Sequence, residues 1–336
     1  MPSHRPIIAL AIGDPNGIGP ELALKAARAC ATSGPRRACA TSGPRPVIIG
    51  DAHVIEHYAR QIAPEFALRA YSAGAAPRDD TIDMLAVDSL PRAAFAPGRI
   101  EPAAGRATVA YVKAALDLVR TGGAQAIVAC PHNETAVNAA GIKFSGYPEL
   151  IAQLCGLPEG RVFLMLVGGG LRIVHATLHE RIHHALARLT PDLVEAAALA
   201  AVDALQSLGV ARPRIGLFGV NPHAGEGGLF GDDDDHITVP AAARLKARGV
   251  DVAGPIGADV LLGHKDFDAF VAMYHDQGHI PVKLVAGRIA SALSIGAGVI
   301  FSTVGHGSAF DIAGQNKGDP EPVLRTLALL AGVQAR

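Results

Sequence analysis

The chain has 336 residues, of which 49% are hydrophobic and 18% are charged; this composition provides a substantial core and excludes a disordered protein. Lys and Arg number 30 against 31 Asp and Glu, and this near-neutral balance argues against nucleic acid or an anionic membrane surface as a partner. No apolar run is long enough to span a membrane, no signal peptide precedes the first strand, and the four cysteines form no CxxC pair, so we expect a cytoplasmic protein.

The first predicted strand, residues 7–12, runs into a glycine-rich turn at residues 13–21. Pro20 and Glu21 suit the first turn of a helix, which we expect to continue to about residue 29. A strand, a glycine turn and a helix in this order resemble a phosphate-binding unit, although the turn lacks the GxGxxG spacing of dinucleotide-binding proteins.

A nine-residue segment, residues 28–36, is repeated without change as residues 37–45. A tandem copy of this kind indicates a surface loop that tolerates insertion. We assign the repeat no function.

The remainder of the chain alternates between predicted strands and helices, which favours parallel α/β layers. Strands are expected at residues 47–50, 126–130, 161–167, 171–177, 214–220, 270–274 and 298–304. Helices are expected at about residues 52–62, 104–121, 190–208, 239–248 and 320–330. Glycines 168–170 predict a tight turn between two of these strands.

Three histidines, His179, His223 and His275, each follow a predicted strand. Ligands of open α/β sheets bind at the carboxyl ends of the strands. Three neutral imidazoles suit Zn²⁺, Co²⁺, Fe²⁺ or Ni²⁺ better than Ca²⁺. Spacing alone leaves open whether the three share one site.

Two other polar groups have simpler interpretations. His183 and His184 are expected on the surface of a helix. The acidic run at residues 232–235 is expected to be a solvated loop rather than a metal site.

The chain resembles the 4-hydroxythreonine-4-phosphate dehydrogenase family over nearly its whole length. The matching stretches are residues 13–21, 221–228, 274–278 and 306–309, together with Asp259. The resemblance implies two α/β/α domains with a cleft between them, as in isocitrate and isopropylmalate dehydrogenases. Residues 1–130 and 276–336 would form a discontinuous domain on the cofactor side, and residues 131–275 a central domain that provides substrate, metal and dimer contacts. It also implies a homodimer with each metal site shared between subunits.

The same resemblance implies roles for individual residues. The metal ligands fall on His179, His223 and His275, for one divalent ion of zinc, cobalt, iron or magnesium. Lys283 is expected to stabilise charge or transfer a proton, and Asp276 and Asp259 to orient the metal shell or take the hydroxyl proton. The expected cofactor is NAD, because an aspartate that accepts from the ribose hydroxyls favours NAD over NADP. Its contacts are expected at Asp14, Gly17, Gly305, His306, Gly307, Ser308, Ala309 and Asp311.

Departures from the family pattern concern the substrate. Residues 146–149 read Gly-Tyr-Pro-Glu where the family usually has Gly-His-Thr-Glu, and Glu134 replaces a usual lysine. Ala292 and Phe301 fall where an asparagine and an arginine usually bind phosphate. Alanine and phenylalanine side chains donate no hydrogen bond, so we predict a more apolar substrate pocket. Arg288 or Lys143 as a replacement phosphate ligand is the alternative.

One branch of the family, which acts on the cis-dihydrodiol of terephthalate, is similar at residues 130–132, 134–135, 144–148, 278–281 and 291–296. The expected substrate contacts are Tyr147, Pro148, Lys283, Ala292 and Phe301. The expected reaction is NAD-linked oxidative decarboxylation of a β-hydroxy acid, 1,2-dihydroxy-3,5-cyclohexadiene-1,4-dicarboxylate, to protocatechuate, CO₂ and NADH.

Three alternatives remain from the sequence. The first is 4-hydroxythreonine-4-phosphate dehydrogenase of pyridoxal phosphate biosynthesis, or a related dehydrogenase of a phosphorylated sugar acid. The second is a metal hydrolase that uses the three histidines and a bound water without NAD. The third is a non-catalytic binding protein, for which neither metal nor NAD would stabilise the fold.

Overall fold

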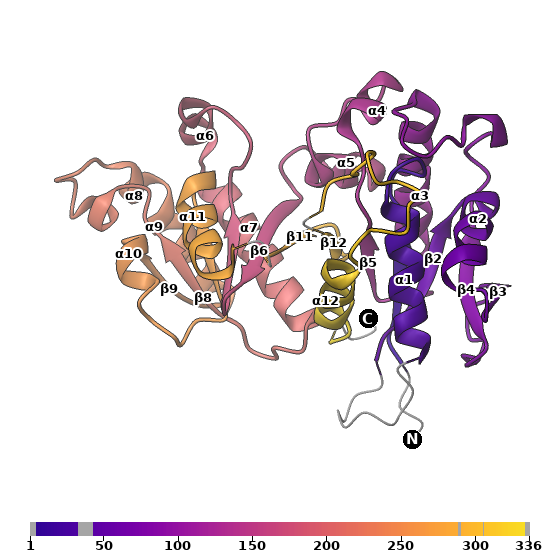
Figure 1. The fold of residues 1–336 in the computed structure, drawn as a ribbon. Helices are drawn as coiled ribbons and strands as arrows, with labels where there is room; N and C mark the ends of the chain where they lie inside the picture. The colour runs from indigo at the N-terminus through magenta and orange to yellow at the C-terminus, as the bar shows by residue number, and fades with distance from the viewer. Residues whose placement is uncertain (1–4, 33–42, 288–289, 305, 333–336) are drawn as a thin grey trace. The chain divides into compact units, whose positions relative to one another are not determined.

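The computed structural model describes residues 5–32, 43–287, 290–304 and 306–332 (Figure 1). The chain divides into a first unit, residues 1–145 and 301–336, and a second unit, residues 146–300. The sequence-based division placed residues 131–145 and 276–300 in the opposite units. Helix α4 (Glu134–Ala139) packs on α3 (Pro102–Arg120), and α11 (His275–Ala286) packs on β6 (Phe163–Gly168) and β7 (Leu171–His175), so packing joins each segment to its unit.

The first unit is built on a parallel sheet in the order β3-β4-β2-β1-β5-β12. Its strands are β1 (Ile7–Ala11), β2 (Arg45–Gly50), β3 (Ala67–Ala70), β4 (Thr81–Ala86), β5 (Ala126–Ala129) and β12 (Phe301–Thr303). The remaining helices are α1 (Gly19–Thr32), α2 (Ala52–Ile62), η1 (Arg92–Ala94) and α12 (Glu321–Leu330). The strands β1, β2 and β5 are buried along their whole length, which explains their continuous apolar sequences. Strands β3 and β4 were not predicted, because they are partly exposed and carry charged residues.

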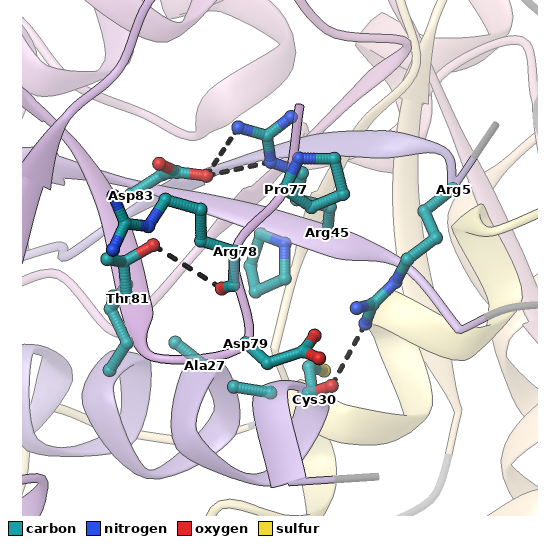
Figure 2. A pocket seen from close by; sticks show the side chains of 12 residues that line it. Arg5, Ala27, Cys30, Arg45, Pro77, Arg78, Asp79, Thr81 and Asp83 are labelled. Carbon is teal, nitrogen blue, oxygen red and sulfur yellow. Dashed lines mark hydrogen bonds and ion pairs between the residues drawn. The ribbon is translucent and has the colours of Figure 1, made fainter. Parts of the chain in front are cut away.

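The second copy of the repeat ends inside this sheet. Arg45, its last residue, begins β2 and forms a buried ion pair with Asp83 of β4 at 2.6 Å (Figure 2). Arg5 donates to the carbonyl oxygens of Cys30 and Gly43 at 2.9 and 2.8 Å. The ends of the repeat are therefore anchored, although residues 33–42 lie outside the described part of the chain.

The second unit is built on a mixed sheet in the order β11-β6-β7-β10-β8-β9. Its other strands are β8 (Arg214–Phe218), β9 (Asp251–Ile256), β10 (Ala269–Ala272) and β11 (Ser291–Ile295), and its other helices are α5 (Tyr147–Leu154), α6 (Ile182–Arg188), α7 (Pro191–Ser207), η2 (Pro222–Gly225), α8 (Asp233–His236), α9 (Thr238–Ala247) and α10 (Ala258–Leu261). Strands β7, β10, β8 and β9 are parallel, but β6 is antiparallel to both of its neighbours. Strand β6 departs from the parallel layers that the sequence favoured, and the predicted tight turn accounts for it, because Gly169 and Gly170, with φ of +59° and +83°, return the chain at once.

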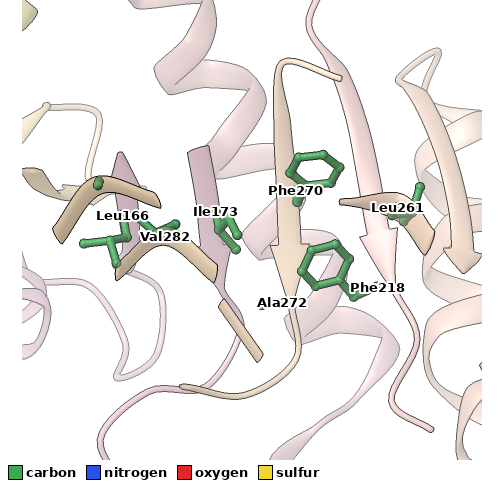
Figure 3. Close-up of a cluster of buried hydrophobic side chains, with 8 residues drawn as sticks. Leu166, Ile173, Phe218, Leu261, Phe270, Ala272 and Val282 are labelled. Atoms are coloured by element: carbon green, nitrogen blue, oxygen red, sulfur yellow. The ribbon is translucent and has the colours of Figure 1, made fainter. Parts of the chain in front are cut away.

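A cluster of buried apolar side chains joins the central strands of this sheet to α11 (Figure 3). Phe218 of β8 and Phe270 of β10 stack with ring centroids 5.4 Å apart, and Val282 of α11 is fully buried in the same cluster. Burial of each such side chain contributes about 2 kcal/mol. The cluster thereby fixes the ends of the strands from which the histidines emerge.

Residues 275–286 form a helix, where the sequence predicted a polar segment after a strand. Gly278 and Pro281 both disfavour a helix, and proline removes one backbone hydrogen bond, which concealed this element in the sequence. The Gln277 side chain ties the start of the helix to the sheet, because it accepts from the Met273 amide and donates to the Gly219 carbonyl, both at 2.8 Å. Across the described ranges, no helix is long and apolar enough to cross a membrane.

Candidate active site

Three parallel strands bring the predicted metal ligands to one edge of the second sheet. Strands β7, β10 and β8 are neighbours and parallel, so their carboxyl ends meet at the same edge. His179 follows β7, His275 follows β10 and His223 follows β8. The arrangement is the one in which open α/β sheets bind ligands.

Two of these three histidines lie close together. The ring centroids of His179 and His275 are 5.4 Å apart, and two imidazoles that share a tetrahedral zinc ion would have centroids about 5 Å apart. This pair therefore fits a divalent metal in spacing and in donor type. His223 lies in a separate loop with its ring 5.7 Å from that of Phe230. Within the described ranges, no three His, Cys, Asp or Glu side chains are grouped to hold a metal ion.

Asp276 determines which nitrogen of His275 faces outward. Its Oδ1 lies 2.7 Å from Nδ1 of His275, so in the neutral ring Nδ1–H donates to the carboxylate and Nε2 keeps its lone pair. A carboxylate on the far nitrogen is the usual support of a metal-binding histidine. His275 and Asp276 also line an open pocket of about 460 Å³, with His179, Tyr274 and Ile182 among its other walls.

The loop that carries His223 is held in an unusual backbone conformation. His223, Ala224 and Glu226 have φ of 54°, 53° and 44°, and each such residue costs about 1–3 kcal/mol. The buried Asp234 supports the loop, because its carboxylate accepts from the amides of Val220 and Asn221 at 2.8 and 3.0 Å. The sequence suggested that the acidic run at residues 232–235 is a solvated loop. Asp234 of this run is instead buried and supports the loop that carries His223.

Asp259 lies beside the same loop, at the start of α10. A Cβ atom placed on Gly257 would lie 2.8 Å from Oδ1 of Asp259 and 3.7 Å from the amide nitrogen of His223. The carboxylate of Asp259, the predicted acid–base residue, therefore lies close to the backbone of the predicted ligand His223.

Two further histidines, His175 and His279, lie beside His275. Nδ1 of His279 is 2.9 Å from Nε2 of His175, and the His279 ring stacks on that of His275 with centroids 3.7 Å apart. Burial lowers the pKa of His175 to about 3. The pKa of His279 is lowered to about 4, mainly by burial and to a smaller extent by the neighbouring histidines. Both rings are therefore neutral at neutral pH.

No role was predicted for His175 and His279 from the sequence. Because α11 was not predicted, the spacing of His275, His279 and Lys283 at every fourth residue was not read as one helix face. Lys283 is exposed, and its charge contributes to the lowered pKa of His279. His183 and His184 are exposed on α6, as predicted.

The predicted substrate residues divide between the two units. Tyr147 is buried and Pro148 partly buried at the start of α5, and Ala292 of β11 packs against the apolar cluster of the second unit. Phe301 begins β12 in the first unit with 0% of its surface exposed, so its ring belongs to the core there. Lys143 is exposed, and Arg288 lies outside the described residues.

Predicted cofactor residues from the two ends of the chain lie side by side in the first unit. The Ile18 amide donates to the Ser308 carbonyl at 3.0 Å. A Cβ atom on Gly17 would lie 2.9 Å from the same oxygen, so the close contact requires glycine. The side chain of Asp311 is exposed in the same loop, which fits a role in binding ribose hydroxyls. Gly305 lies outside the described residues.

Asp14 is fully buried at the bottom of this turn. Its Oδ1 accepts from the Asn16 amide at 2.8 Å, while Oδ2 has no hydrogen-bond partner among the described residues. Burial raises the pKa of Asp14 to about 6, against the opposing effect of the Asn16 hydrogen bond. An unsatisfied buried carboxylate is costly and is typical of a functional site.

A partly buried ion pair on α1 holds the segment that follows the predicted cofactor residues 306–311. The Glu21 carboxylate accepts from the amides of Gly318 and Asn316 at 2.6 and 3.1 Å. Lys25 donates to Glu21 and to the Gly318 carbonyl, both at 2.8 Å. The sequence identified Glu21 only as a residue of a first helical turn.

Known proteins match this chain over almost its entire length. Residues 42–330 match the family described as pyridoxal phosphate biosynthetic protein PdxA. The 1,2-dihydroxy-3,5-cyclohexadiene-1,4-dicarboxylate dehydrogenase of Comamonas sp. is 48% identical over 96% of both chains. The solved terephthalate 1,2-cis-dihydrodiol dehydrogenase of Burkholderia xenovorans LB400 is 55% identical, with a TM-score of 0.80 over 99% of this chain and 100% of that one. The solved 4-hydroxythreonine-4-phosphate dehydrogenase of Burkholderia phymatum is 37% identical, with a TM-score of 0.85 over 99% of both chains.

These similarities and the two α/β units define an oxidoreductase of the dehydrogenase class. Within that class, the chain belongs to the PdxA family. The family and the α/β fold predicted from the sequence motifs are thereby confirmed.

Proposed function

We propose that the protein catalyses the NAD-linked oxidative decarboxylation of 1,2-dihydroxy-3,5-cyclohexadiene-1,4-dicarboxylate to protocatechuate, CO₂ and NADH. The observation that carries the proposal is the 48% identity, over 96% of both chains, to a relative named for that substrate. The residues at the expected phosphate-binding positions agree with it. Ala292 packs in an apolar environment and Phe301 is buried, so neither offers a phosphate a hydrogen bond.

His179, His275 and His223 are the residues that would hold a divalent metal, with Asp276 fixing His275 so that Nε2 faces outward. The metal, when bound, would act as a Lewis acid toward the oxygens of the substrate. Asp259, next to the His223 loop, would take the proton of the reacting hydroxyl while the hydride leaves its carbon for NAD⁺.

Lys283 would complete the second half of the reaction. After the hydride has left, the new keto group stands next to the carbon that bears the carboxylate. The bond to CO₂ then breaks, its electron pair forms a new carbon–carbon double bond in the ring, and the π pair of the carbonyl moves to the keto oxygen. Lys283, exposed on the helix face of His275 and His279, would donate a proton to that oxygen. The product is a phenol, so aromatisation favours the step.

NAD would bind to the first unit, at the turn of residues 13–17 and the loop of residues 306–318. Support comes from the contact of Ile18 with Ser308 and from the exposed carboxylate of Asp311. An aspartate at the ribose favours NAD over NADP, because it repels a 2′-phosphate.

We further propose a homodimer in which the metal site is shared between subunits. Exposed apolar side chains surround the histidines: Ile182 on α6, Phe230 after His223, and Ile280 and Leu284 on α11, the last with 79% of its surface exposed. A large exposed apolar patch is typical of a protein contact. Light scattering should give twice the mass of the chain at micromolar concentration, and a monomer would contradict this arrangement.

The test is NADH formation by the purified protein with added divalent metal. The dihydrodiol and 4-phosphohydroxy-L-threonine are offered separately, with a chelator as control. We expect turnover of the dihydrodiol alone and its loss on chelation. Turnover of the phosphate ester alone would instead assign the protein to pyridoxal phosphate synthesis. The 37% identity to the Burkholderia phymatum enzyme is the observation that favours this alternative. Turnover without NAD would identify a hydrolase.

A further inference from the structure

Hydrogen bonds determine the tautomers of two histidines that no role yet explains. Nδ1 of His175 lies 3.1 Å from the Leu164 carbonyl oxygen, which can only accept, so this nitrogen carries the proton. Nε2 of the neutral His175 ring must then accept from Nδ1 of His279, 2.9 Å away. The proton of neutral His279 is thereby fixed on Nδ1, and its Nε2 is bare.

Because His279 stacks on His275, the Nε2 lone pair of His279 cannot bind the metal ion that His275 binds. The two rings are nearly parallel, at 13°, with centroids 3.7 Å apart. Each imidazole lone pair lies in the plane of its ring, so two stacked rings cannot both direct one at the same ion. His179 is tilted by 45° against His275 and has no such restriction. His279 is therefore a neighbour of the ligand His275 and not a second ligand beside it.

We propose that His175 and His279 are positioning residues that hold the His275 ring in the plane required for metal binding. The role rests on the proposed function, because it presupposes a metal on His275. Asp276 fixes the ring at its edge through Nδ1, and His279 fixes it at its face. The buried His175, bonded to the sheet through Leu164, prevents His279 from rotating.

Gly278 makes this arrangement possible. A Cβ atom on this residue would lie 2.4 Å from Nε2 of His175 and 2.9 Å from the Ile173 side chain. A buried ring and a packed strand residue have no room to move away. The absence of a side chain at Gly278 thus lets His175 reach His279.

Metal affinity tests the positioning role independently of turnover. His279→Leu removes both the stacked ring and the hydrogen bond, and His279→Phe keeps a ring that can stack. His264→Leu, at an exposed histidine of the same unit, is the matched control. We expect zinc affinity, measured by competition with a chromophoric chelator, to fall about 10- to 100-fold in His279→Leu. Zinc affinity should recover in part in His279→Phe, and it should equal that of the wild type in His264→Leu. The visible spectrum of bound Co²⁺ should change most in His279→Leu, less in His279→Phe and not in His264→Leu.

The tautomers can be measured in the metal-free wild type by ¹⁵N NMR of labelled histidines, which needs no variant to fold. We expect the Nδ1–H form for both His175 and His279. An Nε2–H form at His279, or zinc affinity in His279→Leu within twofold of the wild type, would overturn the positioning role and leave the proposed function intact. A wild type that binds no divalent metal would instead refute the metal-dependent function, and the positioning role with it.

Discussion

Asp14 and Asp276 show how the surroundings of one residue type give it different uses. Asp276 is exposed, and its use depends on geometry alone, because its hydrogen bond of 2.7 Å orients His275. Asp14 is buried, with one oxygen unsatisfied and a pKa raised to about 6. At neutral pH the ionised Asp14 destabilises the folded state. A role in cofactor binding would explain why a carboxylate is kept at this position.

Replacement of Asp14 by asparagine should change the pH dependence of stability. Because the native pKa of about 6 lies above the unfolded one, the native state binds more protons between them, so stability falls as pH rises from about 4 to about 6. Asparagine does not ionise, so this pH-dependent loss of stability is absent from Asp14→Asn. Relative to the wild type it should gain up to about 3 kcal/mol between pH 4 and pH 7, measured by urea unfolding. Parallel pH profiles of the two proteins would contradict the raised pKa.

At the scale of elements, the two copies of the repeat complete different structures. The first copy supplies the last turn of α1, with Arg28 paired to Glu65. The second supplies Arg45 of β2. Because Cys30 and Gly43 both accept from the Arg5 guanidinium, their carbonyl oxygens are at most about 8 Å apart.

Deletion of residues 37–45 should therefore leave the fold intact. In the shortened chain Gly34 takes the place of Gly43, and the four residues from Cys30 span up to about 13 Å, enough to close the loop. Arg36 takes the place of Arg45. We expect a Tm within about 4 °C of the wild type, because loop length changes stability by only about 1 kcal/mol. Arg45→Ala in the full chain should melt much lower, since it breaks a buried ion pair. A deletion variant as unstable as Arg45→Ala would show that both copies are needed.

The loop that follows β12 depends on α1 through the buried carboxylate of Glu21. Glu21→Gln removes the charge that binds Lys25 and two loop amides, an interaction worth about 1–3 kcal/mol. We expect the Kd for NAD⁺, measured by calorimetry, to rise about tenfold. Asp117→Asn, which breaks an exposed pair with Lys113, is the control and should bind NAD⁺ normally. Unchanged affinity in Glu21→Gln would place NAD elsewhere.

Elements with a single strong signal were predictable from sequence. The apolar runs of β1 and β5 and the Thr190-Pro191 start of α7 express local preferences that tertiary structure did not override. Strands β3 and β4 lack an apolar run, and α11 contains Gly278 and Pro281, so their conformations come from packing. The strand-end rule identified His179, His223 and His275. It could not show that His175 and His279 meet, because that contact joins residues far apart in the chain.

At the scale of the whole molecule, each compact unit contains one of the two proposed sites. The turn at residues 13–17 and the loop at residues 306–318 lie in the first unit, and the histidines lie in the second. Each ligand should therefore stabilise its own unit, because binding to the native state protects the region it contacts.

Hydrogen exchange of the free protein with either ligand added tests this division. NAD⁺ alone should slow exchange at residues 13–17 and 306–318, and zinc alone at residues 175–179, 220–226 and 275–283. Residues 47–50 of the buried β2 provide an internal reference. Protection of the histidine segments by NAD⁺ without any protection of residues 13–17 and 306–318 would contradict the placement of NAD in the first unit.

The 2.4 Å separation between a Cβ atom on Gly278 and Nε2 of His175 has a consequence for the descent of these sequences. A histidine at position 175 and any side chain at position 278 exclude each other, and the histidine at 279 is left without its acceptor if 175 changes. The dependence runs one way, because a histidine at position 175 requires glycine at 278, whereas glycine at 278 tolerates other residues at 175. Family members that carry histidine at both 175 and 279 should therefore all carry glycine at 278, and a member with that histidine pair and a larger residue at 278 would contradict the packing argument.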